Sequence, residues 1–192
     1  MLLRLATTAD VPAIHEIYAP IVEHTAISFE TVVPSHAEIE RRLADTVPQY
    51  PWLVAADDGV VLGYAYGHRF APRAAYAWSV ETSIYVRDSA RGTGVGRALY
   101  DGLLGLLDAQ GYEQAFAGIA LPNAASIGLH EAVGFRHIGT YERVGFKFDA
   151  WHDVGWWQRA LASHARVPHA PVAVDDLDDA LLQKVLRQSH AS

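Results

Sequence analysis

The chain has 192 residues and contains no cysteine. This absence excludes disulfide bonds, metal sites with thiolate ligands and a thiol nucleophile. The chain also lacks an apolar run of the roughly 18 residues that a bilayer-spanning helix needs, so no membrane partner is expected. The first residues, MLLRLATTADV, turn polar after three apolar side chains and do not resemble a secretory signal, which favours a cytoplasmic location.

Positive charge is also scarce, because 15 Lys and Arg residues stand against 22 Asp and Glu residues and give a formal net charge of −7. A partner held mainly through phosphate neutralisation, such as nucleic acid, is therefore not expected. His152 and Asp153 have no third ligand at a readable spacing, so no metal is expected. Apolar residues make up 51% of the chain, which predicts a globular fold with a core of its own.

Short apolar runs alternate with segments of helical spacing along the first 160 residues. The helix that starts near Val11 is expected to end or kink at Pro20, and Ser35 with Glu38 has the pattern of a capping box. The predicted order is a strand at 2–6, two helices, a β-hairpin at 52–68, a strand at 75–86, a helix at 95–110, a strand at 115–120, a helix at 123–133, and strands at 135–144 and 146–158. This mixed order predicts α/β or α+β architecture with a partly parallel sheet.

The composition changes near residue 163. The stretch HARVPHAPVAV is rich in proline and alanine, and the following DDLDDALLQKVLRQ has the pattern of a short amphipathic helix with an acidic N-terminus. We therefore expect one domain over residues 1–162 and a C-terminal tail over residues 163–192.

A glycine-rich stretch lies between the predicted strand at 75–86 and the helix at 95–110. Glycines let the backbone approach a ligand closely, and N–H groups at a helix N-terminus attract an anion, so a pyrophosphate is the expected occupant. A dinucleotide fingerprint would need glycine where Arg97 or Leu99 stands, and a P-loop would need Gly-Lys-Ser/Thr. An ordinary glycine-rich turn is the alternative. The stretch consists of Arg91, Gly92, Thr93, Gly94, Val95, Gly96 and Arg97.

This stretch has the form R-x-x-G-x-G, and residues 123–135 read NAASIGLHEAVGF. Together the two segments resemble the coenzyme-binding motifs of the GNAT N-acetyltransferases. The resemblance implies the GNAT fold, a central twisted mixed sheet with flanking helices, and acetyl-coenzyme A (acetyl-CoA) as co-substrate. It also implies that the glycine-rich stretch holds the pyrophosphate and that Asn123 and Ser126 belong to the coenzyme site. The main chain of Ile84, Tyr85 and Val86 would hold the acetyl carbonyl and the pantetheine arm.

Further segments narrow the resemblance to one branch of the family. Residues 78–86, residues 121–123 and the string WHDVGWWQ at 151–158 resemble the phosphinothricin acetyltransferases. Members of that branch acetylate the α-amino group of phosphinothricin, methionine sulfoximine or methionine sulfone, and they are commonly dimers. The resemblance therefore implies a small-molecule amine as partner and a homodimer as the assembly.

Glu81 and His130 are the expected catalytic residues. Glu81 lies within an otherwise apolar strand, where partial burial would raise the pKa of its carboxyl group toward the value of a useful base; the alternative is a structural ion pair or hydrogen bond. His130 stands where GNAT enzymes usually have a tyrosine, and an imidazole can give or take a proton near neutral pH; the alternative is a buried structural histidine. In the family that the chain resembles, both matching residues are proposed as catalytic.

The same resemblance implies that Phe29, Arg73 and Tyr76 surround the amine substrate. A guanidinium can bind a carboxylate or phosphinate through two hydrogen bonds, which favours Arg73. A surface or packing role is the alternative for each of the three. Several herbicide-resistance relatives have a lysine where this chain has Ala71, so an uncharged sulfoximine or sulfone head is expected to be preferred over phosphinothricin.

These residues predict transfer of acetyl from acetyl-CoA to the α-amino group of a small amino-acid analogue in one direct step, because no cysteine can carry the acetyl group. Two other functions are consistent with the sequence. The chain could bind coenzyme A without catalysis as a regulatory module, or it could acetylate another small amine or a protein N-terminus.

Overall fold

A computed structural model describes residues 1–161 and 167–188. Its strands form one sheet in the order β1-β2-β3-β4-β5-β7-β6. The neighbours β4 and β5 run parallel, and the other neighbours run antiparallel. The strands are β1 (Leu2–Leu5), β2 (Trp52–Asp57), β3 (Val60–Arg69), β4 (Ser79–Val86), β5 (Gln114–Leu121), β6 (Arg136–Lys147) and β7 (Ala150–Ala160), and the helices are α1 (Val11–His24), α2 (His36–Thr46), α3 (Val95–Gln110), α4 (Ala124–Ala132) and α5 (Asp179–Gln188).

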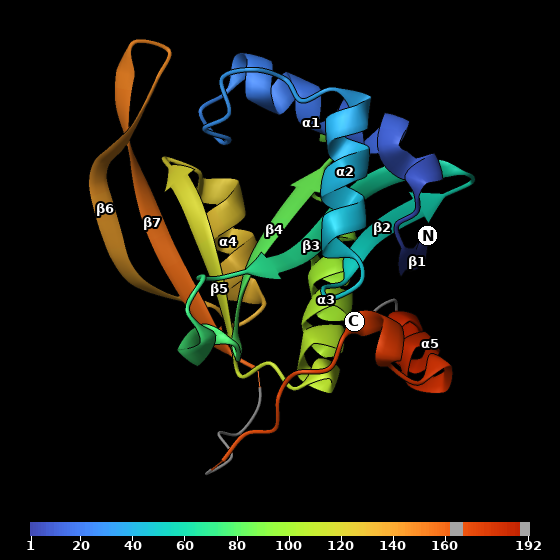
Figure 1. Cartoon of the computed structure of the whole chain (residues 1–192). Helices are drawn as coiled ribbons and strands as arrows, with labels where there is room; N and C mark the ends of the chain where they lie inside the picture. The colour runs from blue at the N-terminus through green and yellow to red at the C-terminus, as the bar shows by residue number, and fades with distance from the viewer. Residues whose placement is uncertain (162–166, 189–192) are drawn as a thin grey trace.

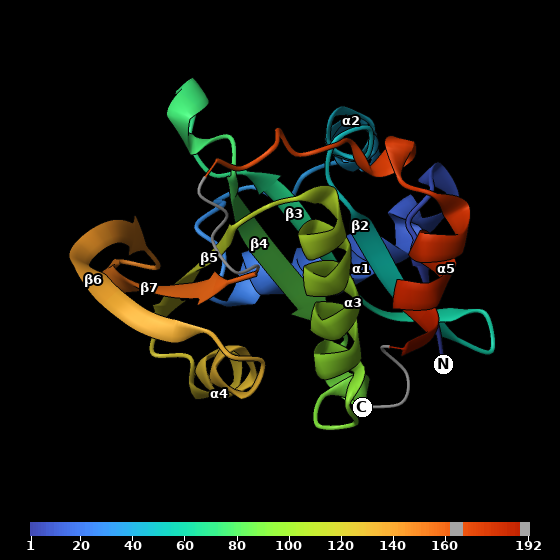
Figure 2. The same ribbon diagram turned by 90° about the horizontal axis from the view of Figure 1, so that it is seen from below.

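Helices cover both faces of this sheet (Figures 1 and 2). On one face, Ile14 of α1 and Leu43 of α2 pack with Val54 of β2. On the other face, Leu103 of α3 packs with Leu53, the residue beside Val54 in the same strand. Because adjacent strand residues point to opposite faces, a nearly unbroken apolar strand such as β2 is the pattern of a sheet buried on both sides. The mixed α/β architecture expected from the order of elements is confirmed.

Two predictions about helix ends are only partly right. Helix α1 continues through Pro20 to His24 because Ile21 and Val22, which follow the proline, are buried in the core. At the start of α2, the side chain of Ser35 accepts a hydrogen bond from the Glu38 N–H, as expected. The Glu38 carboxylate is instead bound by two arginines of the same helix, so the predicted capping box is half formed.

Strand β4 begins at Ser79, four residues later than the predicted start at Ala75. The preceding residues, Ala74–Tyr76, form a single 3₁₀ turn, in which the Ala77 N–H donates to the Ala74 carbonyl oxygen (3.0 Å). The local turn satisfies these backbone groups without a neighbouring strand. As a result residues 70–78, named here the recognition loop, project beyond the sheet rather than extending it (Figure 1).

None of the helices within the described residues is long and apolar enough to cross a membrane. In the same part of the chain, no group of three or more His, Asp or Glu side chains is placed to hold a metal ion.

Candidate active site

The glycine-rich stretch forms the N-terminus of α3. Gly94 is the N-cap residue, with φ of 92°, and among the described residues no side chain caps this helix end. Gly92 has φ of 75°, and a Cβ atom added at Gly92 or Gly94 would meet no protein atom within 4 Å. The left-handed backbone favours glycine at both positions, and the first-turn N–H groups of α3 face open space. This arrangement fits an anion such as a pyrophosphate.

A second part of the site is the opening between β4 and β5. The two strands pair only from Ser79 to Glu81 and then diverge (Figure 1). The Arg87 N–H donates to the Leu62 carbonyl oxygen of the β3 side (2.8 Å). In an antiparallel pair, the main-chain N–H and C=O groups of successive residues point alternately toward the partner strand and away from it. The main-chain groups of Tyr85 therefore point toward β3, and those of Ile84 and Val86 point into the opening. Unpaired main-chain groups at this edge suit an amide-bearing arm such as pantetheine.

These two parts meet in one cavity of about 440 Å³. The cavity brings together most of the residues that the sequence places at the coenzyme. Two expected residues do not line it: Val95 is buried in the core, and the Thr93 hydroxyl donates to the Ala90 carbonyl oxygen (2.7 Å) and so shapes the loop. The expected residues that line the cavity are Ile84, Tyr85, Val86, Arg91, Gly92, Gly94, Gly96, Arg97, Asn123 and Ser126, and they are joined by Ile21, Ile27, Ala90, Ala125 and Leu129.

Asn123 and Ser126 are placed by the start of α4. The Asn123 side chain caps the helix by accepting a hydrogen bond from the Ser126 N–H (3.1 Å). Both residues also line a smaller cavity of about 60 Å³, which contains side chains from both sides of the opening between β4 and β5. The cap therefore fixes α4 at the point where an arm in the larger cavity would enter the sheet.

His130 lies at the inner end of this smaller cavity and is only 3% exposed. Its Nδ1 atom is 2.7 Å from the Ser126 carbonyl oxygen, and its Nε2 atom is 2.6 Å from the Tyr100 hydroxyl. Since a carbonyl oxygen only accepts, Nδ1 carries the proton and Nε2 accepts from Tyr100. Burial lowers the pKa of His130, so the imidazole is neutral at neutral pH. The residue that sequence reasoning missed here is Tyr100, which is fully buried beside His130.

Glu81 occupies the last paired position of β4, opposite Phe116 of β5. Its side chain is 26% exposed, and burial raises the pKa of its carboxyl group to about 7. Nε2 of His68 in β3 lies 3.9 Å from the carboxylate, and burial lowers the pKa of this imidazole, so it is neutral at neutral pH. Such a pKa suits a general base at neutral pH.

Glu81 and His130 reach the opening from opposite faces of the sheet. The hydroxyl of Thr82, the next residue after Glu81, lies 3.4 Å from Tyr100 on the face that holds His130. Glu81 points to the other face because side chains alternate along a strand. The pair that the sequence treats as acting together is therefore brought to one place, but from two sides.

A further cavity, of about 600 Å³, lies on the face of Glu81. Arg73 and Tyr76 of the recognition loop, which the sequence assigns to the substrate, both line it. The guanidinium of Arg69 donates to the carbonyl oxygens of Ala71 and Pro72 and so holds the start of this loop. The other lining residues, which sequence reasoning did not assign to the substrate, are Phe70, Ala71, Pro72, Phe116, Ile138, Gly139, Tyr141 and Trp156.

Glu81 is not among the residues that line either cavity, but its neighbours connect it to both. Its partner in the sheet, Phe116, lines the 600 Å³ cavity, and its chain neighbour Thr82 lines the small cavity at the opening. A group bound in the 600 Å³ cavity and a group that enters through the opening would therefore meet beside Glu81. The arrangement suits a transfer reaction between two ligands.

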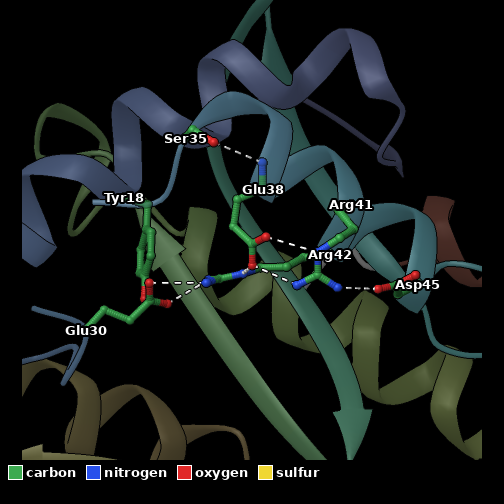
Figure 3. Close-up of polar contacts among 7 residues, drawn as sticks. All are labelled: Tyr18, Glu30, Ser35, Glu38, Arg41, Arg42 and Asp45. Atoms are coloured by element: carbon green, nitrogen blue, oxygen red, sulfur yellow. Dashed lines mark hydrogen bonds and ion pairs between the residues drawn. The ribbon is translucent and has the colours of Figure 1, made fainter. Parts of the chain in front are cut away.

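Phe29 does not line the 600 Å³ cavity. Its ring packs against Gly145 of β6, where a Cβ atom would lie 2.1 Å from the ring. The connection between α1 and α2 that carries Phe29 is held by polar contacts (Figure 3): Glu30 accepts from Tyr18 (2.9 Å) and Arg42 (2.7 Å). Phe29 thus lies against the far part of the β6–β7 hairpin in this single chain.

The fold, the glycine-rich N-terminus of α3 and the opening between β4 and β5 fit a transferase that uses an extended anionic coenzyme. The family described as acetyltransferase (GNAT) domain matches residues 3–156. The chain belongs to this family and is an acetyl-CoA-dependent acetyltransferase.

Relatives and solved structures agree with this assignment. The chain is 41% identical over 157 residues to phosphinothricin N-acetyltransferase of Streptomyces viridochromogenes, which covers 82% of this chain and 86% of that protein. It is 36% identical over 166 residues to an L-methionine sulfoximine/L-methionine sulfone acetyltransferase of Salmonella typhimurium (86% and 97% covered). A phosphinothricin acetyltransferase of Sinorhizobium meliloti, solved with acetyl-CoA, superposes with a TM-score of 0.85 at 40% identity (91% and 96% covered).

Proposed function

We propose that this enzyme transfers acetyl from acetyl-CoA to the α-amino group of a small amino-acid analogue with a tetrahedral head, such as methionine sulfone, methionine sulfoximine or phosphinothricin. The proposal is carried by the position of Glu81, a carboxylate with a raised pKa whose neighbours Thr82 and Phe116 line the coenzyme opening and the cavity that contains Arg73. The names of the two curated relatives support this substrate class.

The proposed chemistry is a direct transfer. The amine nitrogen, once Glu81 has taken a proton from the ammonium group, attacks the thioester carbonyl carbon. The nitrogen keeps two protons as the new carbon–nitrogen bond forms. The carbon–sulfur bond then breaks, coenzyme A leaves as a thiolate, and the nitrogen loses one of these protons as the amide forms, which balances the proton that the thiolate takes up. Without cysteine, the chain has no thiol to carry an acetyl group between two half-reactions.

The remaining site residues receive roles from their positions. The N–H groups of the α3 N-terminus and Arg91 and Arg97 would hold the pyrophosphate, and the main chain of Ile84 and Val86 would hold the pantetheine arm. The buried pair of His130 and Tyr100 lies on the side of the opening where the thiolate would form. Tyr100 of this pair is therefore proposed to pass a proton to the thiolate and to regain the one that the nitrogen loses as the amide forms.

Two functions from other classes make different predictions. A regulatory module would bind coenzyme A and release no thiol. An enzyme for protein N-termini would need a groove long enough for a peptide, whereas the recognition loop and Tyr141 and Trp156 of the β6–β7 hairpin bound the 600 Å³ cavity on two sides. A small acceptor is therefore favoured.

The test is a thiol-release assay with acetyl-CoA and four acceptors: methionine sulfone, methionine sulfoximine, phosphinothricin and a short peptide with a free N-terminus. We expect the highest kcat/KM for the sulfone or sulfoximine and the lowest for the peptide. Arg73→Lys keeps the positive charge but removes the guanidinium, which can donate two parallel hydrogen bonds to one anionic group. This variant should raise KM for the amino-acid analogue about tenfold and leave KM for acetyl-CoA unchanged. Thiol release with the peptide alone, or with none of the four, would contradict the proposal.

A homodimer is proposed as the assembly. Strand β6 is an edge of the sheet, and several large apolar side chains of the β6–β7 hairpin are half exposed. Such a surface favours a partner of the same chemistry, here a second copy of the chain. Sedimentation analysis of the purified chain tests the proposed dimer. The cytoplasmic location expected from the sequence stays a prediction. The exposed side chains are Ile138, Tyr141, Val144, Phe146, Phe148 and Trp151.

A further inference from the structure

The described C-terminal residues 167–188, named here the strap, pack on the domain rather than extending away from it (Figure 2). The family match ends at residue 156, so the strap lies outside it. Helix α5 of the strap buries Leu186 to 4% exposure and packs Val185 against Gly105 of α3, where a Cβ atom would lie 2.8 Å from the valine. Asp178, the residue before the helix, caps it: its side chain accepts a hydrogen bond from the Leu181 N–H (3.1 Å).

The extended part of the strap is fixed by backbone hydrogen bonds to the end of α3. The Val172 N–H donates to the Gln110 carbonyl oxygen (2.9 Å), and the Gln110 side-chain amide donates back to the Val172 carbonyl oxygen (2.8 Å). Gln110 is only 2% exposed, and Val174 of the strap is 2% exposed. Breaking this contact would leave buried polar groups without partners, so the strap is held firmly at this point.

From this anchor the strap reaches the recognition loop. The indole N–H of Trp78, the last residue of that loop, donates to the His169 carbonyl oxygen (2.6 Å). Ala170 and Pro171 of the strap also line a cavity of about 350 Å³ whose other walls include Arg73 and Tyr76. The loop is therefore held at its start by Arg69. At its end the Trp78 carbonyl oxygen accepts from the Glu113 and Gln114 N–H groups, and the strap holds the Trp78 side chain.

We infer that the strap is a positioning element for amine recognition: by holding Trp78 it fixes the recognition loop in the arrangement that presents Arg73 and Tyr76 to the amine. A side chain that must meet a charged head within a fraction of an ångström needs such support from its own backbone. The inference rests on the proposed function, because it takes the 600 Å³ cavity as the amine site. It assigns no role to the strap in binding acetyl-CoA.

Two variants release the strap in different ways. Trp78→Phe removes the indole N–H and keeps an aromatic ring, so the hydrogen bond to His169 is lost with little change in packing. Leu186→Asp places a charge in the contact between α5 and the domain. Leu181→Asp is the matched control, because Leu181 lies in the same helix but is 36% exposed.

Steady-state kinetics and hydrogen–deuterium exchange of the full chain test the inference. Trp78→Phe and Leu186→Asp should each raise KM for the amine about fivefold or more, leave KM for acetyl-CoA unchanged, and speed amide exchange in residues 70–78 by a similar factor. Leu181→Asp should change none of these. If Leu186→Asp lowers Tm so far that it cannot be assayed, Trp78→Phe decides alone.

Unchanged exchange in residues 70–78 and an unchanged amine KM in Trp78→Phe would overturn the inference. An equal rise of both KM values would also overturn it, since that result indicates a general loss of structure. Failure of the proposed function is distinguishable: wild-type chain would then acetylate none of the amino-acid analogues, while the exchange measurement would still report whether the strap orders the loop.

Discussion

Replacement of Glu81 by glutamine should change activity and stability in opposite directions. Burial raises the pKa of Glu81 from the ordinary value of 4.5 to about 7. The folded chain therefore holds this proton more tightly than the unfolded chain does. Below pH 4.5 the Glu81 carboxyl group is neutral in both the folded and the unfolded chain, so it does not lower the free energy of unfolding. The cost of keeping a buried carboxylate grows as pH rises from 4.5 to 7, and above pH 7 it amounts to about 3 kcal/mol.

Glu81→Gln keeps the shape of the side chain and cannot ionise. The variant should be about 3 kcal/mol more stable than wild type at pH 8.5, which corresponds to a Tm higher by roughly 6–12 °C, and the gap should shrink below about 1 kcal/mol at pH 5. Its kcat should fall on the order of 10²–10⁴-fold, with KM for acetyl-CoA unchanged. In the wild type, kcat/KM should fall about tenfold per pH unit below pH 7, because only the ionised carboxylate accepts a proton.

Thermal unfolding at the two pH values and a pH–rate profile measure these effects. Glu23→Gln serves as the control, because Glu23 is a 55% exposed glutamate of α1 that lines neither the 440 Å³ nor the 600 Å³ cavity, and its replacement should leave kcat unchanged. An equal stability gap at pH 5 and pH 8.5 would refute the burial argument. Wild-type kcat in Glu81→Gln would refute the assignment of Glu81 as the base.

Three further substitutions test other parts of the site. Gly94→Ala places a methyl group in the open space at the N-terminus of α3 and strains a backbone φ of 92°. Calorimetry should therefore show at least about tenfold weaker binding of coenzyme A. Gly128→Ala is the control, because a Cβ atom there also meets no protein atom within 4 Å, and this variant should bind coenzyme A normally. His130→Phe removes the acceptor of the buried Tyr100 hydroxyl, so kcat should fall and the free energy of unfolding should drop by about 1–3 kcal/mol in urea titrations. Ala71→Lys adds a cation to the 600 Å³ cavity, and competition assays should show kcat/KM shifting about fivefold toward phosphinothricin; no shift would mean that Ala71 does not set this preference.

The coenzyme side of the site is readable from sequence because its signals are local. Gly92 and Gly94 must adopt positive φ within one short stretch, and the helix they open follows directly. The Asn123 side chain caps α4 by accepting a hydrogen bond from the N–H of Ser126, which is three residues later in the chain. In each case the residues that create the geometry are neighbours in the chain, so a short motif carries the whole arrangement.

The amine side could not be predicted in the same way. Phe116 reaches the cavity through the pairing of β5 with β4, and Tyr141 and Trp156 reach it only because β7 pairs with β5 and carries β6 beside it. Tertiary packing also decides where Phe29 lies, against Gly145 rather than beside Arg73. Such contacts depend on register between distant strands, which no local pattern specifies.

The same reasoning applies to the two expected catalytic residues. Sequence alone identifies Glu81 as a carboxylate in an apolar strand and His130 as a helix residue. It does not show that the two side chains approach from opposite faces of the sheet. The partner that holds His130, Tyr100, lies one helix away and shows only as a core position in the helical pattern of α3. Alternation along β4 fixes the result, because Thr82 faces Tyr100 and Glu81 therefore faces the other cavity.

The central claim is that acetyl-CoA and a small amine meet at Glu81 from two sides of the β4–β5 opening. A crystal structure of the enzyme with coenzyme A and methionine sulfone bound together tests it most directly. We predict the pyrophosphate on the N–H groups at the start of α3, the thiol in the opening beside Tyr100, and the amine nitrogen directed toward Glu81 with the carboxylate or sulfone on Arg73. Methionine sulfone bound away from the recognition loop, or a thiol that does not enter between β4 and β5, would contradict the account.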